Sequence, residues 1–167
     1  MSDPDPGAPE LVVGAWRGYR IWRMASDRLT GCWYTGYAWA PGSSEASCAA
    51  KRWTRKGRRA RHPGLAAPQG GCRCGLYALQ EPWDFAGYLP FSVFGVTDES
   101  KVVIGVVAGW GRAFRGERGW RTQFARPVAL YRAPHVDREQ LDRIARRYGC
   151  LVVEGRSDLR TLVDQRA

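Results

Sequence analysis

The chain contains 167 residues, of which 44% are hydrophobic, and its formal net charge is +10. This length accommodates one hydrophobic core, so we expect a single domain over 11–167, and no apolar run reaches the ~20 residues of a membrane-spanning helix. The positive charge, carried mainly by Arg, fits either a surface that attracts nucleic acid or another polyanion, or a solubilising composition of the kind that high-GC genomes produce.

Residues 1–10 are rich in Asp and Pro and lack the basic and apolar regions of a secretory signal, so we expect a disordered tail and a cytoplasmic protein. The chain from 11 to 39 is rich in Trp, Tyr, Val and Ile with glycines between them. This composition favours two strands, over 11–23 and 29–39, connected by a turn at 24–27.

A polar, basic segment follows from 41 to 71. Gly and Pro occur throughout it, so we expect one long loop without regular structure. A loop of about thirty residues is uncommon in a compact domain unless something holds it, and a metal ion bound at its two ends would do so.

The next elements are mainly strands. Residues 75–80 fit either a short helix or a strand, and 81–89 fit a helical turn. Segment 101–111 is β-branched and apolar, and 121–130 partly alternates polar with apolar residues. These two segments are predicted to pair, connected by an exposed turn at 115–119 that contains two glycines.

Two helices are expected at the C-terminal end of the sequence. Asp137 is the predicted N-cap of the first, and Gly149 ends it. Its apolar face contains Leu141, Ile144, Ala145 and Tyr148. A strand at 150–154 follows, and Ser157 is the predicted cap of a last short helix.

Four residues have metal-ligand chemistry in common: Cys48, His62, Cys72 and Cys74. Zinc prefers thiolate and imidazole ligands, and four of them leave no open position for a substrate, so the sequence predicts a structural zinc ion. In an extended chain Cys72 and Cys74 point to the same side. Their C-x-C spacing departs from the commoner C-x2-C knuckle, and two alternatives stay open: Cys72 and Cys74 as free thiols beside a surface His62, or a two-iron iron–sulfur cluster.

Motifs of known enzymes are missing from the sequence. A zinc-dependent nucleobase deaminase requires H-x-E and P-C-x-x-C, whereas His62 is followed by Pro63 and Gly64. Phosphate-binding, hydrolase and metalloprotease motifs do not occur either. An enzyme is therefore not the favoured interpretation; its remaining candidate groups are Cys32, Asp84, Glu117 and His135. Otherwise Cys32 and Cys150 are expected to be small buried thiols.

Seven cations and one tryptophan lie between Cys48 and His62, with no acidic residue among them. They are Lys51, Arg52, Trp53, Arg55, Lys56, Arg58, Arg59 and Arg61. Guanidinium groups form paired hydrogen bonds with phosphates, and a Trp ring stacks on an unpaired base, so this segment predicts a nucleic-acid-binding loop. The alternative is a solvated loop, or one that binds another acidic partner.

Aromatic residues crowd the predicted strands. Strand alternation cannot place Trp33, Tyr34, Tyr37 and Trp39 on one face, so some of these rings should line a surface or a pocket. Such a pocket would fit a flat base or a methylated cation, and the alternative is ordinary packing. The candidate pocket residues are Trp33, Trp39, Trp110 and Trp120.

Two blocks of the chain contain short, distinctive motifs. The stretch from Trp39 to Ala78 contains W-x-P-G, A-x-C, H-P, A-P and C-x-C-G-x-Y-A, and a later block contains W-G-R at 110–112 and G-W-R at 119–121. Together they resemble a pattern in small uncharacterised actinobacterial proteins, a group with no established activity, so the resemblance implies only a shared fold. The G-V-V run at 105–107 followed by R-P-V-A-L at 126–130 also resembles strands of PUA-like β-barrels, several of which bind modified bases.

Taken together, the residues predict an α+β domain built on a small twisted β-sheet or a partly open β-barrel, with a zinc-stapled long loop and C-terminal helices. The favoured function is non-catalytic binding of DNA or RNA through the basic loop, with aromatic rings stacking on bases. The alternatives are a protein-interaction or regulatory module that uses exposed aromatics, and a small enzyme whose cleft the sequence does not locate.

Overall fold

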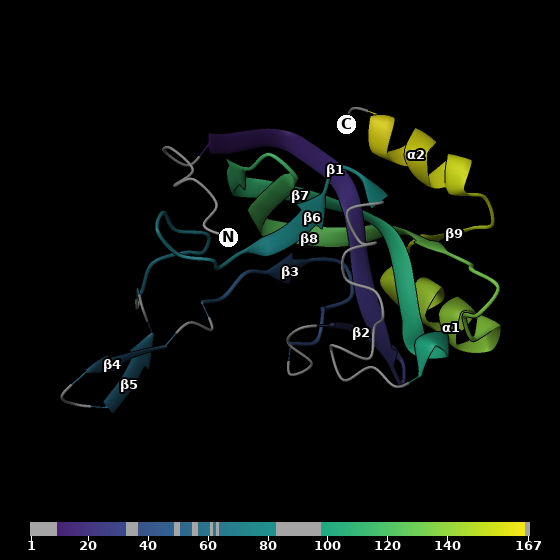
Figure 1. Ribbon diagram of the computed structural model, residues 1–167, viewed down its shortest axis with the longest axis horizontal. Helices are drawn as coiled ribbons and strands as arrows, with labels where there is room; N and C mark the ends of the chain where they lie inside the picture. The colour runs from purple at the N-terminus through teal and green to yellow at the C-terminus, as the bar shows by residue number, and fades with distance from the viewer. Residues whose placement is uncertain are drawn as a thin grey trace.

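A computed structural model describes residues 10–32, 37–48, 51–54, 57–60, 62, 64–82 and 98–165, with the backbone alone at 10, 12–13, 51–54 and 57–60. This part of the chain is mixed α+β, mostly strands with two helices (Figure 1). The strands are β1 Glu10–Ala25, β2 Arg28–Gly31, β3 Ser44–Glu45, β4 Lys51–Thr54, β5 Gly57–Ala60, β6 Leu76–Leu79, β7 Val102–Arg115, β8 Gly119–Tyr131 and β9 Leu151–Val153. The helices are α1 Arg138–Tyr148 and α2 Arg156–Asp164, and a 3-10 turn at Glu99–Lys101 precedes β7.

Four strands form a partial ring. β1 pairs with β7, β7 with β8, β8 with β6, and β6 returns to β1 through the pair Tyr19–Leu79, all antiparallel. Glycines permit the close approach at the closing strand, since a Cβ on Gly18 would lie 2.8 Å from the Leu79 carbonyl oxygen and one on Gly119 only 2.1 Å from that of Ala78. The partly ring-like sheet agrees with the predicted small sheet or partly open barrel.

The long hairpin of β7 and β8 is the centre of the sheet and confirms the predicted pair of strands. Both strands are longer than expected, because β7 continues to Arg115 past a register shift between Trp110 and Ala113. Gly111 lies within this bulge at a φ of 80°, a conformation that glycine adopts without strain. The turn between the strands narrows to 116–118.

The prediction of a second strand over 29–39 is wrong beyond Gly31. The chain reverses after β2: Ala38 bridges back to Thr30, and the Trp39 amide donates to the Leu29 carbonyl at 2.8 Å. This reversal buries Trp39 edge-on against the ring of Trp22, with 5.4 Å between ring centroids. Burial of a large ring therefore overrides the β-propensity of this segment; residues 33–36 lie outside the described part.

The segment from 41 to 71 is also more structured than the predicted loop. It contains β3, which pairs with β8, and the separate β4–β5 hairpin, which projects from the body in Figure 1. Residues 75–80 form the strand β6 rather than a helix, whereas the helical turn expected at 81–89 falls mostly outside the described residues.

The C-terminal elements follow the prediction closely. Asp137 caps α1 by accepting from the Gln140 amide, and Gly149 ends the helix in the left-handed conformation at a φ of 62°. Strand β9 pairs parallel to β8. The expected cap of α2 is wrong: Gly155 is the N-cap and its amide donates to the Asp158 carboxylate at 3.2 Å, because Ser157 already lies in the first turn.

The two helices stabilise two core clusters. Alternate residues of a strand face opposite sides of a sheet, and Trp22 and Val107 pack with α1, whereas Tyr19 and Val106 pack with Leu159 of α2. The first, larger cluster extends to Leu76 and to the cysteines that precede β6. Within the described residues, no helix is long and apolar enough to cross a membrane.

Candidate metal centre

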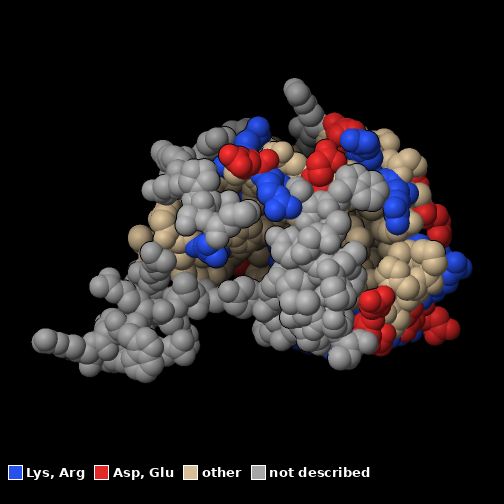
Figure 2. All heavy atoms as spheres, in the orientation of Figure 1, with Lys and Arg blue, Asp and Glu red and all other residues tan. Residues whose placement is uncertain are grey.

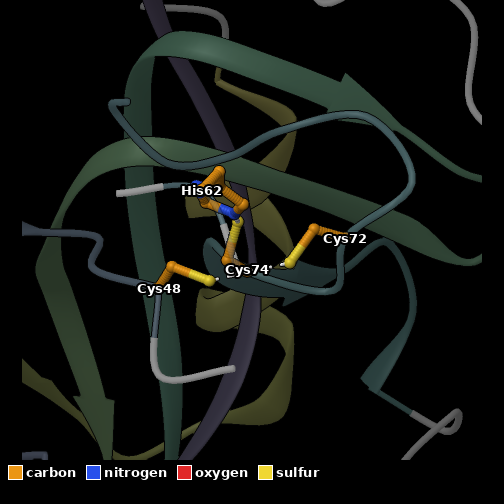
Figure 3. A group of neighbouring side chains, drawn as sticks. All are labelled: Cys48, His62, Cys72 and Cys74. Atoms are coloured by element: carbon orange, nitrogen blue, oxygen red, sulfur yellow. Dashed lines mark hydrogen bonds between the residues drawn. The ribbon is translucent and has the colours of Figure 1, made fainter. Parts of the chain in front are cut away.

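The four predicted ligand residues meet at one point, where their side chains face one another (Figure 3). The Sγ atoms of Cys48 and Cys72 are 3.7 Å apart, and the Sγ of Cys74 is 3.2 Å from Nε2 of His62. All four ligand atoms lie within 4.8 Å of one another. Cys72 and Cys74 are buried, and Cys48 and His62 are half-buried. The predicted set is therefore close enough to hold one metal ion.

Strand β8 positions both cysteine-bearing segments. β3 pairs with it at Ala125 and Phe124, and the Ala46 amide donates to the Gln123 carbonyl at 2.7 Å, which fixes the chain just before Cys48. β6 pairs with the same strand from Leu76 onward, directly after Cys74. The segments before Cys48 and after Cys74, far apart in the sequence, thus come together because β3 and β6 both pair with β8.

Two glycines shape the backbone around the C-x-C pair. Gly71 has a φ of 61° and Gly75 a φ of 133°, both in the range that side chains disfavour. A Cβ on Gly75 would also lie 3.0 Å from the Cβ of Arg121. Between the ligands, the exposed Arg73 presents its carbonyl to the Tyr77 hydroxyl at 2.7 Å. The turn holds both sulfurs inward and Arg73 outward, as predicted.

Arg121 organises this turn and was not identified from the sequence. It is only 7% exposed, and its Nη1 donates to the carbonyl oxygens of Cys72 and Cys74. Its Nη2 donates to the Gln69 carbonyl at 3.3 Å, and its guanidinium lies 4.3 Å from the centre of the Phe114 ring. The sequence contains only a weak signal for Arg121, a single arginine within a predicted strand. The structure shows that both of its neighbours, Trp120 and Thr122, are buried as well.

The thiols differ in acidity. Burial raises the pKa of Cys72, but hydrogen bonds from His62, the Cys74 amide and the neighbouring thiols outweigh it and lower the pKa to about 7. Burial and the Cys72 sulfur raise the pKa of Cys74 to about 11. One thiolate therefore forms readily at neutral pH, and the next requires a cation nearby. Such a set of buried thiols binds a metal ion with release of protons.

The predicted nucleic-acid-binding residues lie on or beside the β4–β5 hairpin, between Cys48 and His62. The register places Arg52 opposite Arg59 and Trp53 opposite Arg58. Lys51 begins β4, and Arg55, Lys56 and Arg61 lie outside the described residues. No acidic residue occurs from 46 to 80, and this stretch contains eight Lys and Arg, hence +8 of the net charge of +10.

Two of the four residues proposed for an aromatic pocket are buried in the core. Trp39 and Trp120 are core side chains, 2% and 5% exposed, and pack edge-on against Trp22 and Trp16 respectively. Trp110 is half-buried and stacks on Phe124 with 6.0 Å between ring centroids. Trp33 lies outside the described residues. Packing within the larger core cluster, to which both belong, therefore accounts for Trp39 and Trp120.

The remaining candidate catalytic groups are dispersed. Burial raises the pKa of Cys32 and of Cys150 to about 11, so both stay protonated at neutral pH and serve as packing groups. His135 and Glu117 are exposed, and Asp84 lies outside the described residues. The described residues contain one group of three or more neighbouring His, Cys, Asp or Glu ligands, the metal cluster itself.

Comparisons with protein-family models, with curated proteins and with solved structures gave no match to this chain.

Proposed function

We propose that the cluster of Cys48, His62, Cys72 and Cys74 holds a structural zinc ion, and that this ion closes the base of a basic β-ribbon that binds nucleic acid. The observation that carries the proposal is the position of the ribbon: β4 and β5 leave the body at Cys48 and return at His62, so two ligands of one site lie at its two ends.

The distances favour one ion over a two-iron cluster. A tetrahedral zinc site with Zn–S bonds of about 2.3 Å has its sulfurs ~3.8 Å apart, close to the 3.7 Å between Cys48 and Cys72. An iron–sulfur cluster of the two-iron type divides its ligands between two metal atoms, which requires a wider spread than ligand atoms within 4.8 Å. Four protein ligands also leave no open position, so the ion stabilises structure rather than activating water.

The charge of the ribbon supports a polyanionic partner. Like charges directly opposite each other destabilise an antiparallel pair, and the register sets Arg52 opposite Arg59. Phosphates would relieve that repulsion, and Trp53 would add stacking on a base. By contrast, the described surface in Figure 2 carries positive and negative side chains next to one another. The strongest segregation of positive charge is in the segment that the metal holds.

Three finer statements stay predictions. The partly ring-like sheet supports the resemblance to PUA-like barrels, which would make modified bases candidate ligands. A cytoplasmic location follows from the reduced thiols that the metal site requires. DNA and RNA are both retained as partners, because phosphate contacts do not distinguish them.

The test is fluorescence anisotropy of zinc-loaded protein with labelled single-stranded DNA, duplex DNA and structured RNA across a salt series. We expect the logarithm of the binding constant to fall linearly with the logarithm of the salt concentration, with a slope of about 0.7–0.9 per phosphate contacted. Replacing Arg55, Arg58 and Arg59 with Gln should reduce that slope and weaken binding to every sequence.

A matched control removes the same charge elsewhere. Arg138, Arg143 and Arg146 are exposed on α1, and their triple replacement by Gln should leave the salt slope nearly unchanged. Equal losses of affinity in the two triple variants would mean that binding depends only on the net charge of the protein. No binding at physiological salt would refute the nucleic-acid proposal. Either outcome would favour the alternative of a protein-interaction module.

A further inference from the structure

We infer that Arg121 is a positioning residue that sets the charge balance of the metal centre, so that the site holds three thiolates and a divalent ion. The inference rests on the proposed metal site and is independent of nucleic-acid binding. It starts from a buried guanidinium: Arg121 is 7% exposed, and among the described residues its partners are carbonyl oxygens and an aromatic ring.

A buried cation without a carboxylate partner is costly. Carbonyl dipoles and the Phe114 ring offset part of that cost, but neither carries a net charge. The compensating anion is present once a metal binds, because a divalent ion with three thiolates and one neutral imidazole has a net charge of −1. Arg121 then forms a neutral buried pair with the centre beside it.

The contacts place that charge on the backbone of the residues that carry the thiols. Nη1 of Arg121 donates to the carbonyls of Cys72 and Cys74, the two most buried residues of the cluster. Nη2 reaches Gln69, whose carbonyl also accepts from the Cys72 amide at 3.3 Å. One planar group therefore ties three carbonyls of the turn together, a geometry that a lysine ammonium does not reproduce.

Two roles are separable by substitution. Arg121→Lys keeps the charge and loses the fork of hydrogen bonds, whereas Arg121→Gln keeps a donor and loses the charge. The readout is Co²⁺ substituted for zinc, because its sulfur-to-metal charge-transfer absorption reports the number of thiolates, combined with competition against a chelator and the pH at which the metal is released. Arg132→Gln is the control, since Arg132 pairs with Asp142 and Glu154 away from the cluster.

We expect Arg121→Gln to lower the Co²⁺ affinity about 10- to 100-fold and to raise the pH of metal release, as outer-shell changes do at other sites. Arg121→Lys should fall between this variant and the wild type, and Arg132→Gln should match the wild type. Cys48→His removes one thiolate charge, so in that background Arg121→Gln should cost less affinity than in the wild type, a coupling that a purely structural arginine would not show.

The outcomes distinguish the two proposals. Metal bound by the wild type and equally well by Arg121→Gln would overturn the role of Arg121 and leave the metal site standing. Equal losses in Arg121→Lys and Arg121→Gln, without coupling to Cys48→His, would also overturn the charge argument. If the wild type binds neither Co²⁺ nor Zn²⁺, both proposals fail together. Should Arg121→Gln not fold, Arg121→Lys decides the question, because it keeps the charge: retained Co²⁺ binding with only a small rise in the pH of release would support the charge argument, and loss of Co²⁺ binding would overturn it.

Discussion

The body of the protein and its ligand segment are stabilised by different physics. The body, β1, β7, β8, α1 and α2, buries large apolar side chains such as Trp22, Leu130 and Leu141 at 0% exposure. The ligand segment, residues 44–75, buries mostly small groups, among them Ser44, Ala46 and the two cysteines. Apolar burial contributes about 25 cal/mol per Å², so the small side chains of the ligand segment gain little from it.

The comparison implies that the two regions respond to different perturbations. Loss of the metal should release the ligand segment and spare the body, whereas a cavity in the body should lower stability with or without metal. Several contacts connect them among the described residues: β3 pairs with β8, and Ala46, Ala67 and the two cysteines lie in the larger core cluster. Tyr148 bonds to the chain that leads toward β3, and Arg121 bonds to the turn before β6.

The largest effect is expected from Cys74→Ala. Structural zinc contributes about 10–16 kcal/mol of apparent binding free energy in zinc-finger peptides, and loss of one ligand forfeits most of it. We expect no stoichiometric metal and rapid proteolysis between β3 and β6, with the helical circular dichroism of the body retained. Cys150→Ser is the control, because Cys150 lies outside the cluster and should leave metal content unchanged. Intact protease resistance without metal would contradict the division.

Ile144→Ala tests the other side of the comparison. Ile144 is fully buried in the larger core cluster, so its truncation should cost about 2–5 kcal/mol in the free energy of unfolding. Cys72 and Cys74 belong to the same core cluster as Ile144, so this variant tests the division directly. If the body is stable without metal, urea titrations of metal-loaded and chelated protein should give the same loss. A loss seen only in the loaded form would mean that the two regions fold as one unit.

The sequence predicted the body well because its signals are local. Capping by Asp137, a glycine at the end of α1 and β-branched runs in β7 each act within a few residues. The grouping of Cys48, His62, Cys72 and Cys74 was also predictable, since few residue types bind zinc and only two histidines occur in the chain.

The failures have a common cause in long-range contacts. Trp39 does not continue the predicted strand, because it packs on Trp22. Arg121 bonds to the carbonyl of Cys74, 47 residues earlier in the chain. Neither partner is visible in a local window of sequence. The β4–β5 hairpin was missed because its charges and glycine are typical of a loop, and its backbone register pairs two residues of like charge, Arg52 and Arg59.

Tyr148→Phe should have an intermediate effect, because it severs one connection between the two regions. The buried hydroxyl donates to the Trp39 carbonyl at 2.6 Å and accepts from the Leu29 amide at 3.1 Å. Its removal leaves two buried backbone groups unpaired, which costs about 1–3 kcal/mol. Amide hydrogen exchange should accelerate at Leu29, while metal affinity stays at the wild-type value if the regions are independent. A parallel loss of metal affinity would show that this hydrogen bond couples them.

Asp137→Asn should have the smallest effect and concerns the body alone. The Nζ of Lys101 bonds to the Asp137 carboxylate at 2.8 Å, and this contact, with the Gln140 amide, lowers the carboxyl pKa below its ordinary value of 3.8. A lowered pKa in the folded state contributes stability above the ordinary pKa, and that contribution disappears as the pH falls through the folded value. Asn still caps a helix, so only the charge is lost.

Thermal unfolding of metal-free protein is the appropriate measurement for this variant, because acid would otherwise protonate the metal ligands at the same time. The wild type should unfold at a slightly higher temperature than Asp137→Asn near pH 7, and the two should converge below the folded pKa of Asp137. Glu139→Gln is the matched control, since Glu139 is exposed in the first turn of α1 and makes only a 3.8 Å ion pair with Arg143. A difference in unfolding temperature that persists at low pH would assign the effect to altered capping rather than to the charge. The contribution of Asp137 at the N-terminal end of α1 would then be as independent of pH as that of the apolar core that the helix covers.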